Sequence, residues 1–279
     1  MTRALDGGRA VERFTTDDLA RPLALGPGAR RIVSLAPSCT ESLLALGAGD
    51  RLVGVEEHSE LPTALAHLPR IGGFRYLDLA RVVALEPDLV VAASLHAVAV
   101  VPRLAADGLR VFAFLPRTLD DVVDGMARLA AVIGIARPAA GWLAAARARI
   151  ARVVERTVRG GRRPLVYVEL SPRGHTGGPQ SFVHDLVTKA GGVNAGGLAR
   201  VEWPVLSAAT VRRLDPEVIV LARYPGSATA ETLAARDGWA GLAAVKTRRV
   251  FEVPSPTLKH PGPLAIDGLE CVAALLARD

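Results

Sequence analysis

A short pattern of residues occurs twice in this chain, once in each half. Residues 85–91, with the sequence LEPDLVV, reappear as residues 214–220, with the sequence LDPEVIV. Proline breaks the preceding helical pattern in both copies, and an apolar run follows, which is typical of a helix leading into a buried strand. A second pair, residues 108–114 and 247–253, follows in the same order. The repeat predicts two similar α/β lobes.

Near-continuous apolar runs predict strands at residues 30–35, 52–55, 89–93, 111–115 and 165–170. Helices are expected between them, at 42–46 behind a capping box at 38–41, and at 79–85. Strands that are apolar throughout and alternate with helices are typical of a parallel sheet with helices on both faces. The expected fold class is therefore α/β, with two parallel-sheet lobes.

One long helical stretch separates the lobes. Residues 119–159 keep a helical pattern that is interrupted only at Pro138, and the piece from 139 to 159 would be about 30 Å long at 1.5 Å per residue. The predicted organisation is a polar lead-in (1–29), an N-terminal lobe (30–117), a helical linker with the long backbone helix (118–161) and a C-terminal lobe (162–279). Facing lobes of this type share a ligand cleft at the carboxyl ends of their strands.

Composition excludes several classes of protein. The chain has 279 residues, of which 50% are hydrophobic and 22% charged, so it is not intrinsically disordered. The longest nearly apolar stretch, residues 89–101, is too short to span a bilayer. Two cysteines exclude a disulfide scaffold, and their redox state stays open. Residues 1–22 contain no apolar run of signal-peptide length, which predicts a cytoplasmic location; the alternative is periplasmic or cell-surface, if the start site is misassigned.

The net charge of +6 raises the possibility of a nucleic-acid partner, but the distribution of the arginines argues against one. Only three of the 34 basic residues are lysines, and the arginines are scattered among acids. The exception is a stripe on one helix face, at Arg149, Arg152, Arg156 and Arg159. It is interpreted either as a solvated helix back or as a docking face for an anionic partner.

Four segments together resemble a known family: residues 31–41 (RIVSLAPSCTE), residues 85–90 (LEPDLV), Trp203-Pro204 followed by Ser207, and residues 260–263 (HPGP). From about residue 30 onward the chain resembles the substrate-binding proteins of vitamin-B12 and ferric-siderophore ABC importers, the helical-backbone metal receptors, and most closely their cobalamin-binding branch. The resemblance implies two lobes bridged by one long helix. It also implies a monomer that needs no cofactor and binds a corrinoid or other metal chelate between the lobes without catalysis.

The resemblance also assigns positions. Phe74 and Trp203 keep aromatic residues where the cobalamin binders place them around the ligand, whereas His58 and His175 replace two others. The ligands implied are cobalamin or another corrinoid, haem, or a ferric siderophore. Members of the family dock on their permease through one glutamate in each lobe, and the matching positions here are Ala80 and Ala209. Loss of both acids removes charge complementarity, which predicts a protein no longer coupled to such a permease.

Histidines carry the most informative chemistry. His58, His96, His175 and His260 each follow the carboxyl end of a predicted strand, whereas His67 and His184 are interpreted as structural. Four imidazoles that converge on one cleft could bind Zn²⁺, Co²⁺ or the metal of haem or a corrinoid. Glu56, Glu57 and Glu60 either complete a mixed metal shell or are solvated. Two alternatives stay open: a receptor for haem or a divalent ion, and a metal-dependent enzyme built on the histidine cleft.

Overall fold

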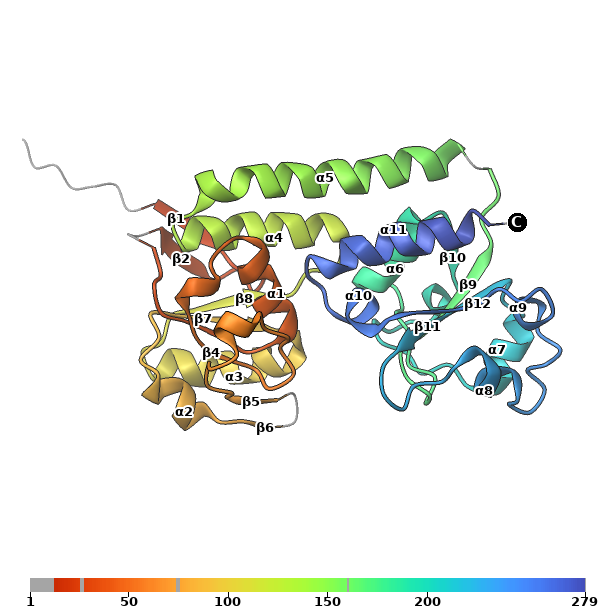
Figure 1. The fold of residues 1–279 in the computed structure, drawn as a ribbon, viewed down its shortest axis with the longest axis horizontal. Helices are drawn as coiled ribbons and strands as arrows, with labels where there is room; N and C mark the ends of the chain where they lie inside the picture. The colour runs from red at the N-terminus through yellow and green to blue at the C-terminus, as the bar shows by residue number, and fades with distance from the viewer. Residues whose placement is uncertain (1–12, 26–27, 74–75, 160, 279) are drawn as a thin grey trace, which may run out of the picture.

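Two α/β lobes lie side by side, and one long helix runs along both of them (Figure 1). The computed structural model describes residues 13–25, 28–73, 76–159 and 161–278, with the side chains of 13 and 94–98 excepted. Among the described residues, no helix is both long and apolar enough to cross a membrane.

Each lobe is built on a four-stranded parallel sheet. The N-terminal sheet has the order β4-β3-β7-β8 and consists of β3 (Ile32–Ser34), β4 (Leu52–Val55), β7 (Leu89–Ala93) and β8 (Val111–Phe114). The C-terminal sheet has the order β10-β9-β11-β12 and consists of β9 (Leu165–Glu169), β10 (Val193–Asn194), β11 (Val218–Arg223) and β12 (Val250–Pro254). In both sheets the first strand of the lobe lies between the second and the third. The two-lobe α/β fold class is thereby confirmed.

Short helices cover the sheets and connect the strands. In the N-terminal lobe they are α1 (Pro37–Ala45), α2 (Leu79–Ala84), α3 (Ser94–Ala106) and the 3₁₀ turns Gly49–Arg51 and Thr63–Leu65, beside a small antiparallel pair of β5 (Gly72–Gly73) and β6 (Tyr76–Leu77). In the C-terminal lobe they are α6 (Phe182–Lys189), α7 (Ala208–Leu214), α8 (Ala230–Ala234), α9 (Ala243–Lys246), α10 (Ser255–Lys259), α11 (Leu264–Leu276) and the 3₁₀ turn Ala195–Leu198.

The sequence repeat has a structural counterpart. Glu86 and Asp215 occupy the same position of the repeat, between helix and strand, and both have a φ of 45°, in the left-handed region. Two residues further on, the carboxylate of Asp88 accepts hydrogen bonds from the backbone of Arg30 and Arg31, and that of Glu217 accepts one from the backbone of Leu165. The repeated acidic residues therefore form the same helix-to-strand turn in both lobes.

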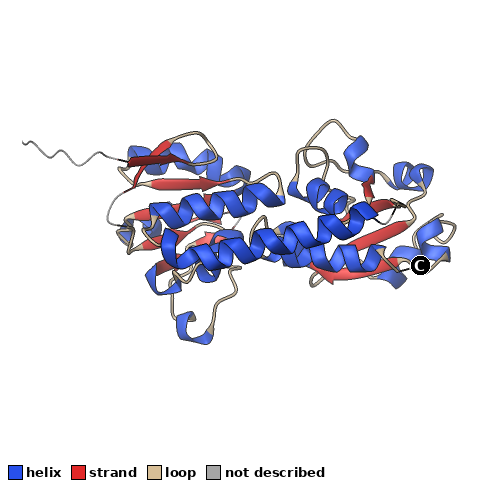
Figure 2. Ribbon diagram, turned by 90° about the horizontal axis from the view of Figure 1, so that it is seen from above, coloured by secondary structure: helices blue, strands red, loops and turns tan. Residues whose placement is uncertain are grey.

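Two consecutive helices, and not one, connect the lobes. α4 (Leu119–Val132) ends before Gly134, whose φ of 74° reverses the chain, and α5 (Ala136–Arg159) then runs for 24 residues along both lobes (Figure 2). The break therefore lies at Gly134 and not at Pro138, because proline is tolerated in the first turn of a helix, where its missing N–H costs no hydrogen bond. Pro138 is the third residue of α5.

One apolar face of α5 joins the cores of the two lobes. Its buried residues recur every three or four positions: Ala139, Leu143, Ala146, Ile150 and Val153. They belong to a single apolar cluster that also contains side chains of α4 and β7 from one lobe and of β11 and α11 from the other. Two smaller clusters fill the outer faces of the N-terminal and C-terminal sheets. The central core thus extends through both lobes.

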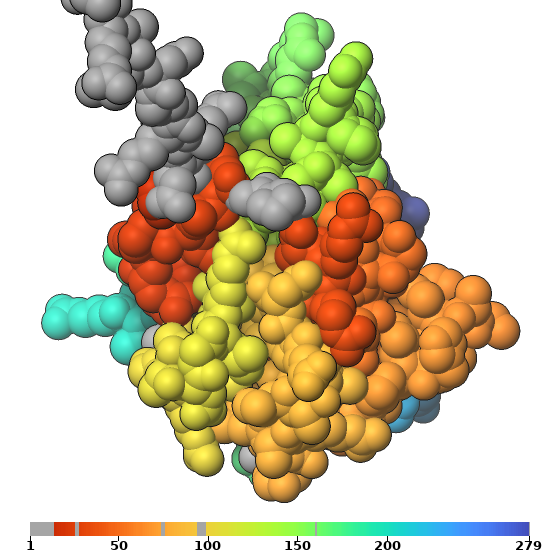
Figure 3. Space-filling model, turned by 90° about the vertical axis from the view of Figure 1, so that its left-hand side faces the viewer, coloured from red at the N-terminus to blue at the C-terminus, as the bar shows by residue number. Residues whose placement is uncertain are grey.

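Two local expectations are corrected. The capping box at 38–41 does not form, because α1 begins at Pro37 with Ala36 and not Ser38 at the N-cap position, and Glu41 reaches the other lobe. The expected lead-in contains an antiparallel hairpin of β1 (Arg13–Thr16) and β2 (Pro22–Leu25), red in Figure 3, which contacts α4. The first strand, RFTT, has no apolar run, and the second, PLAL, is an isolated apolar run of four residues.

Arg149 differs from the rest of the arginine stripe and matches neither of the two interpretations. Arg149 is paired inside the molecule, because its guanidinium donates to Asp267 at 2.6 Å and to Glu270 at 2.6 Å, both on α11. These carboxylates raise the pKa of Arg149 above its ordinary value, mainly through the hydrogen bond with Glu270. Arg152, Arg156 and Arg159 are exposed. Arg149 therefore fixes α5 against the C-terminal lobe, and the rest of the stripe is a solvated helix back.

Truncation within the apolar face of α5 is expected to destabilise the whole chain. Ile150→Ala should lower the free energy of unfolding by about 2–5 kcal/mol, because the side chain is 3% exposed and its removal leaves a cavity in the shared core. Urea unfolding followed by circular dichroism measures the change. Val158→Ala, on the same helix at 77% exposure, is the matched control and should change little. Equal effects of the two substitutions would contradict a shared core.

Candidate ligand-binding site between the lobes

The segments that follow the strands of the two sheets touch each other across the lobes. Glu41, on α1 after β3, contacts Nδ1 of His260 at 2.6 Å, and His260 follows β12 and α10. The backbone N–H of Leu119, after β8, donates to Asp185 on α6 at 2.8 Å. A hollow beside this second contact is lined from one lobe by Arg117 and from the other by His184. The carboxyl ends of both sheets therefore face one another. Open α/β sheets bind ligands at the carboxyl ends of their strands.

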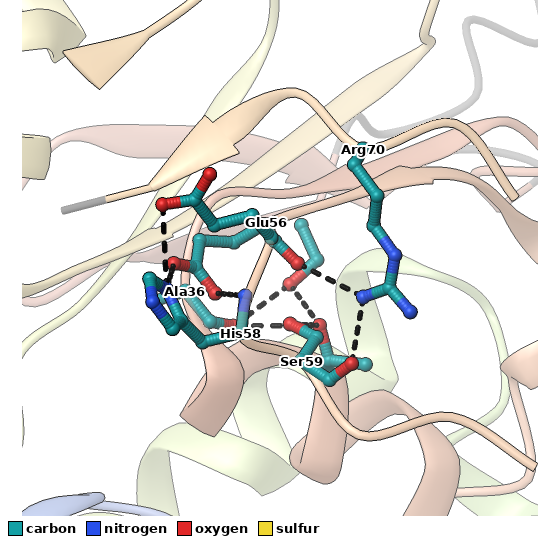
Figure 4. Close-up of polar contacts among 8 residues, drawn as sticks. Ala36, Glu56, His58, Ser59 and Arg70 are labelled. Carbon is teal, nitrogen blue, oxygen red and sulfur yellow. Dashed lines mark hydrogen bonds and ion pairs between the residues drawn. The ribbon is translucent and has the colours of Figure 1, made fainter.

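In the N-terminal lobe, the loop after β4 lies at the carboxyl edge of the sheet, which faces the other lobe. The carboxylate of Glu56 is 3% exposed, whereas the side chain of His58 is 69% exposed. Glu56 holds His58 at two points, since Oε2 accepts from the backbone N–H of His58 at 2.7 Å and Oε1 lies 2.7 Å from Nδ1 of its ring (Figure 4). Oε1 of Glu57 lies 3.6 Å from the same nitrogen. The loop presents one exposed imidazole that two carboxylates orient.

Buried polar groups beneath this loop fix its backbone. Nη1 of Arg70 donates to the carbonyl oxygens of Glu56 at 3.2 Å and of Ser59 at 2.7 Å. The hydroxyl of Ser59 lies 2.9 Å from that of Thr40, which donates to Ser34 on β3 at 2.8 Å. Figure 4 shows these contacts meeting around Ser59. Because Thr40 lies on α1 next to Glu41, the His58 loop is tied to the helix that contacts the other lobe.

The carboxylates change the acidity of His58. The hydrogen bond with Glu56 raises the pKa of His58 above its ordinary value of 6.5, and the charges of Glu56 and Glu57 add to this effect, while partial burial opposes it. Glu56 also selects the tautomer, because Nδ1 carries the hydrogen of this bond in either protonation state. When the ring is neutral, Nε2 is the nitrogen whose lone pair is available to a ligand.

On the C-terminal side, the edge is formed by two paired loops. The loop after β9 lies against residues 201–206, with hydrogen bonds from the backbone N–H of Gly178 to Glu202 at 2.7 Å and from that of Thr176 to Pro204 at 3.0 Å. A Cβ at Gly178 would lie 2.1 Å from the carbonyl oxygen of Val201, so only glycine fits here. His175 is exposed in this pair of loops, with Nδ1 2.7 Å from the hydroxyl of Ser171.

An apolar surface stands out on these loops. Trp203 is 39% exposed, and its ring centroid lies 5.9 Å from that of Phe182, which supports one side of the indole. Val201 and Val205, two positions before and after it, are more than half exposed. Val201, Trp203 and Val205 are thus three exposed apolar residues of one loop, which we call the Trp203 strip.

Two further pairs at the same edge carry no signal in the sequence. Nζ of Lys259 lies 3.7 Å from the ring centroid of Tyr224, and burial lowers the pKa of Lys259 below its ordinary value. Arg236 binds the buried carboxylate of Glu169 through both terminal nitrogens, at 2.7 and 2.8 Å. Glu41 was also missed as an interlobe residue, although it lies inside the segment RIVSLAPSCTE, whose similarity to the family could have marked it.

The structure locates the described site residues at the two facing edges, but it does not bring the described side chains of His58, His175 and His260 together into one group of metal ligands. His58 lies on the N-terminal edge, His175 and Trp203 on the C-terminal edge, and His260 in the contact with Glu41. Phe74 lies outside the described residues, and His96 is the third residue of α3, with its side chain outside them. Among the described residues, the only group of three or more potential metal ligands within reach of one another is Glu56, Glu57 and His58. His67 and His184 lie in a turn and in α6.

The two expected docking positions are equivalent and exposed. Ala80 is the second residue of α2 and Ala209 the second residue of α7, and neither helix has an acidic residue in its first turn. Each helix is capped by the residue before it, Asp78 and Ser207 respectively. The nearest carboxylate, that of Asp78, is engaged with the backbone of Arg81 at 2.9 Å.

Comparison with known proteins identifies the family. The periplasmic binding protein family matches residues 32–257, and the chain belongs to it. The uncharacterized ABC transporter substrate-binding lipoprotein YvrC of Bacillus subtilis (strain 168) is 26% identical over 258 residues, which are 90% of this chain and 81% of that protein. The expected resemblance is confirmed, and the role that it implies is that of a substrate-binding protein.

Solved structures agree. The crystal structure of the periplasmic vitamin B12 binding protein BtuF of Vibrio cholerae superposes with a TM-score of 0.76 at 25% identity, covering 89% of this chain and 97% of that one. The periplasmic heme-binding protein RhuT from Roseiflexus sp. RS-1 also gives a TM-score of 0.76 at 25% identity, covering 89% and 98%. Both of these proteins are described as periplasmic, so the expected cytoplasmic location finds no support among these relatives.

The acidity of His58 provides a direct check of the edge geometry. Its pKa, measured by NMR titration of the imidazole protons, should lie above 6.5 and fall in Glu56→Gln, which removes the charge of the partner. Because the folded-state pKa is raised, this pair stabilises the fold at pH values below 6.5, and the contribution is lost as the pH rises through the raised pKa.

Glu60→Gln is the matched control, since Glu60 lies in the same loop and no hydrogen bond or ion pair joins it to His58 among the described residues. This substitution should leave the pKa of His58 unchanged. An identical His58 pKa in the wild type and in Glu56→Gln would contradict the assigned contact.

Proposed function

We propose that this protein is a substrate-binding protein of the ABC-importer type and binds a metal chelate of the corrinoid or haem type between its lobes, without catalysis. The observation that carries the proposal is the difference between the two facing edges. One presents an imidazole oriented by carboxylates, and the other presents the Trp203 strip. A flat chelate has the same two requirements: a donor for its metal and an apolar surface for its ring.

The Trp203 strip favours a large, flat ligand over a free ion. Exposed apolar side chains next to one another cost free energy in water, and contact with the face of a macrocycle removes that cost. The tilted contact with Phe182 holds the indole in place, so little side-chain entropy is lost on binding. The vitamin B12 binding protein and the heme-binding protein to which the chain is similar support the same ligand class.

We also infer a location outside the cytoplasmic membrane and action as a monomer. The relatives with this fold are described as periplasmic, and YvrC as a lipoprotein. A single chain supplies both edges of the site, so no second copy is required. The metal-dependent enzyme stays the alternative of another class, and it predicts turnover of a substrate in the presence of Zn²⁺ or Co²⁺, whereas a binding protein only titrates.

Substitution of Trp203 tests the ligand class. Trp203→Ala should weaken the binding of haem or cobalamin by about 1–3 kcal/mol, the range for a large aromatic side chain buried against a ligand. Titration with each compound, followed by quenching of tryptophan fluorescence, gives the affinity. Trp142→Phe, on α5, is the control and should keep both the affinity and the quenching. Unchanged affinity in Trp203→Ala would remove this residue from the site.

Coupling to a permease is the second point to test. We propose that the protein does not dock on a vitamin-B12 permease, because Ala80 and Ala209 offer no charge to its arginines. Saturated with ligand, it should leave the ATPase rate of such a transporter in proteoliposomes unchanged, and Ala80→Glu with Ala209→Glu should raise that rate. Ala80→Gln with Ala209→Gln controls for side-chain size without charge. Strong stimulation by the unmodified protein would contradict the uncoupling.

A further inference from the structure

The carboxylate of Glu56 acts on His58 as a clamp. One oxygen binds the backbone N–H of His58 and the other binds Nδ1 of its ring, both at 2.7 Å. The two bonds fix the backbone and the ring together, so the ring cannot turn without breaking one of them. An exposed histidine on a surface loop normally samples several rotamers, and this one is held in a single orientation.

Hydrogen bonds fix the backbone of Glu56, and among the described residues its carboxylate has no charged partner except His58. Its backbone N–H donates to Ser34 on β3 at 3.0 Å, and its carbonyl oxygen accepts from Arg70 and from the backbone of Ser59. The guanidinium of Arg70 thus donates to backbone carbonyl oxygens and not to the carboxylate of Glu56. A carboxylate that is 3% exposed, with only a histidine as its charged partner, favours positive charge on or beyond that ring.

We propose that Nε2 of His58 coordinates the central metal of the bound chelate and that Glu56 is the positioning residue for this bond. The inference rests on the proposed function. The lone pair of Nε2 replaces a water molecule on the metal, and the water leaves. A histidine whose second nitrogen donates to a carboxylate is a stronger donor with a fixed tautomer, which is the usual arrangement around protein-bound metals.

This assignment narrows the ligand class. A metal with an exchangeable axial position, as in ferric haem or an aquo-corrinoid, accepts Nε2 as a ligand. A ferric siderophore whose six positions are filled has no place for it, and neither does a corrinoid with two inert axial ligands. The site therefore selects planar chelates with an open axial face, and the Trp203 strip adds apolar contact with the ring.

Two other uses of His58 fit the geometry less well. A protonated ring could bind an anionic group of the ligand, but Glu57 lies 3.6 Å from the same ring and Glu60 is in the same loop, so an anion would meet two further negative charges. A free divalent ion held by Glu56, Glu57 and His58 together would need the ligand atoms that the clamp already uses. Coordination through Nε2 keeps every contact of the clamp.

Two cobinamides that differ only in their axial ligands isolate this bond. Diaquocobinamide exchanges its water, whereas dicyanocobinamide holds its cyanides. The wild-type protein should bind the diaquo form at least about tenfold more tightly, with a change in its visible absorption spectrum on binding. His58→Ala should abolish both the preference and the spectral change, so that the two cobinamides bind this variant with similar affinity. His67→Ala, an exposed histidine of the same lobe, is the matched control and should behave as wild type.

Glu56→Gln separates positioning from folding. With ferric haem as the probe, this variant should keep the histidine ligand but raise the reduction potential of the bound iron, because a neutral amide makes the imidazole a weaker donor. A merely structural role for Glu56 would leave the potential unchanged. Equal affinities for the two cobinamides in wild type, unaffected by His58→Ala, would overturn the coordination while leaving cleft binding intact. Failure of cobinamides, cobalamin and haem alike to bind would overturn the proposed function itself.

Discussion

The apolar face of α5 is the constraint on which the rest of the structure depends. Leu143, Ala146 and Ile150 lie in one core with side chains from both sheets, and Arg149 adds a charged link to α11. Because a packed core does not deform continuously, a helix that shares its core with two lobes permits small rocking and resists wide hinge motion. The separation of the two binding edges is therefore largely set before any ligand arrives.

The two facing edges of the lobes differ in the contacts that they offer to a ligand. The N-terminal edge is polar and rigid, since Arg70 and Ser59 fix the loop that carries Glu56 and His58. The C-terminal edge is apolar, since paired loops expose the Trp203 strip. His260, expected among the metal ligands, instead contacts Glu41 and links the lobes beside the site. His260 therefore links the two lobes, whereas His58 is the residue for which we propose a contact with the ligand.

Periodicity and repetition were enough to predict the architecture. The predicted strands at 52–55 and 89–93 coincide with β4 and β7, since continuous apolar runs specify buried parallel strands, and the repeat at Glu86 and Asp215 specifies the same turn twice. The β1–β2 hairpin was not predicted, because β1, RFTT, has no apolar run and β2, PLAL, has no neighbouring strand signal to pair with. The site was predicted less completely, because its decisive contacts are tertiary: the bond of His260 with Glu41 spans 219 residues, and the two-point hold of Glu56 on His58 depends on burial that no local pattern reveals.

A crystal structure of the protein grown with diaquocobinamide tests the central claim most directly, since it locates the metal and the ring in one measurement. The account predicts the cobalt bound to Nε2 of His58, the ring between the two lobes with one side against Trp203, and the contact between Glu41 and His260 unchanged. A cleft that stays empty at saturating cobinamide, or a cobinamide bound elsewhere on the molecule, would contradict it.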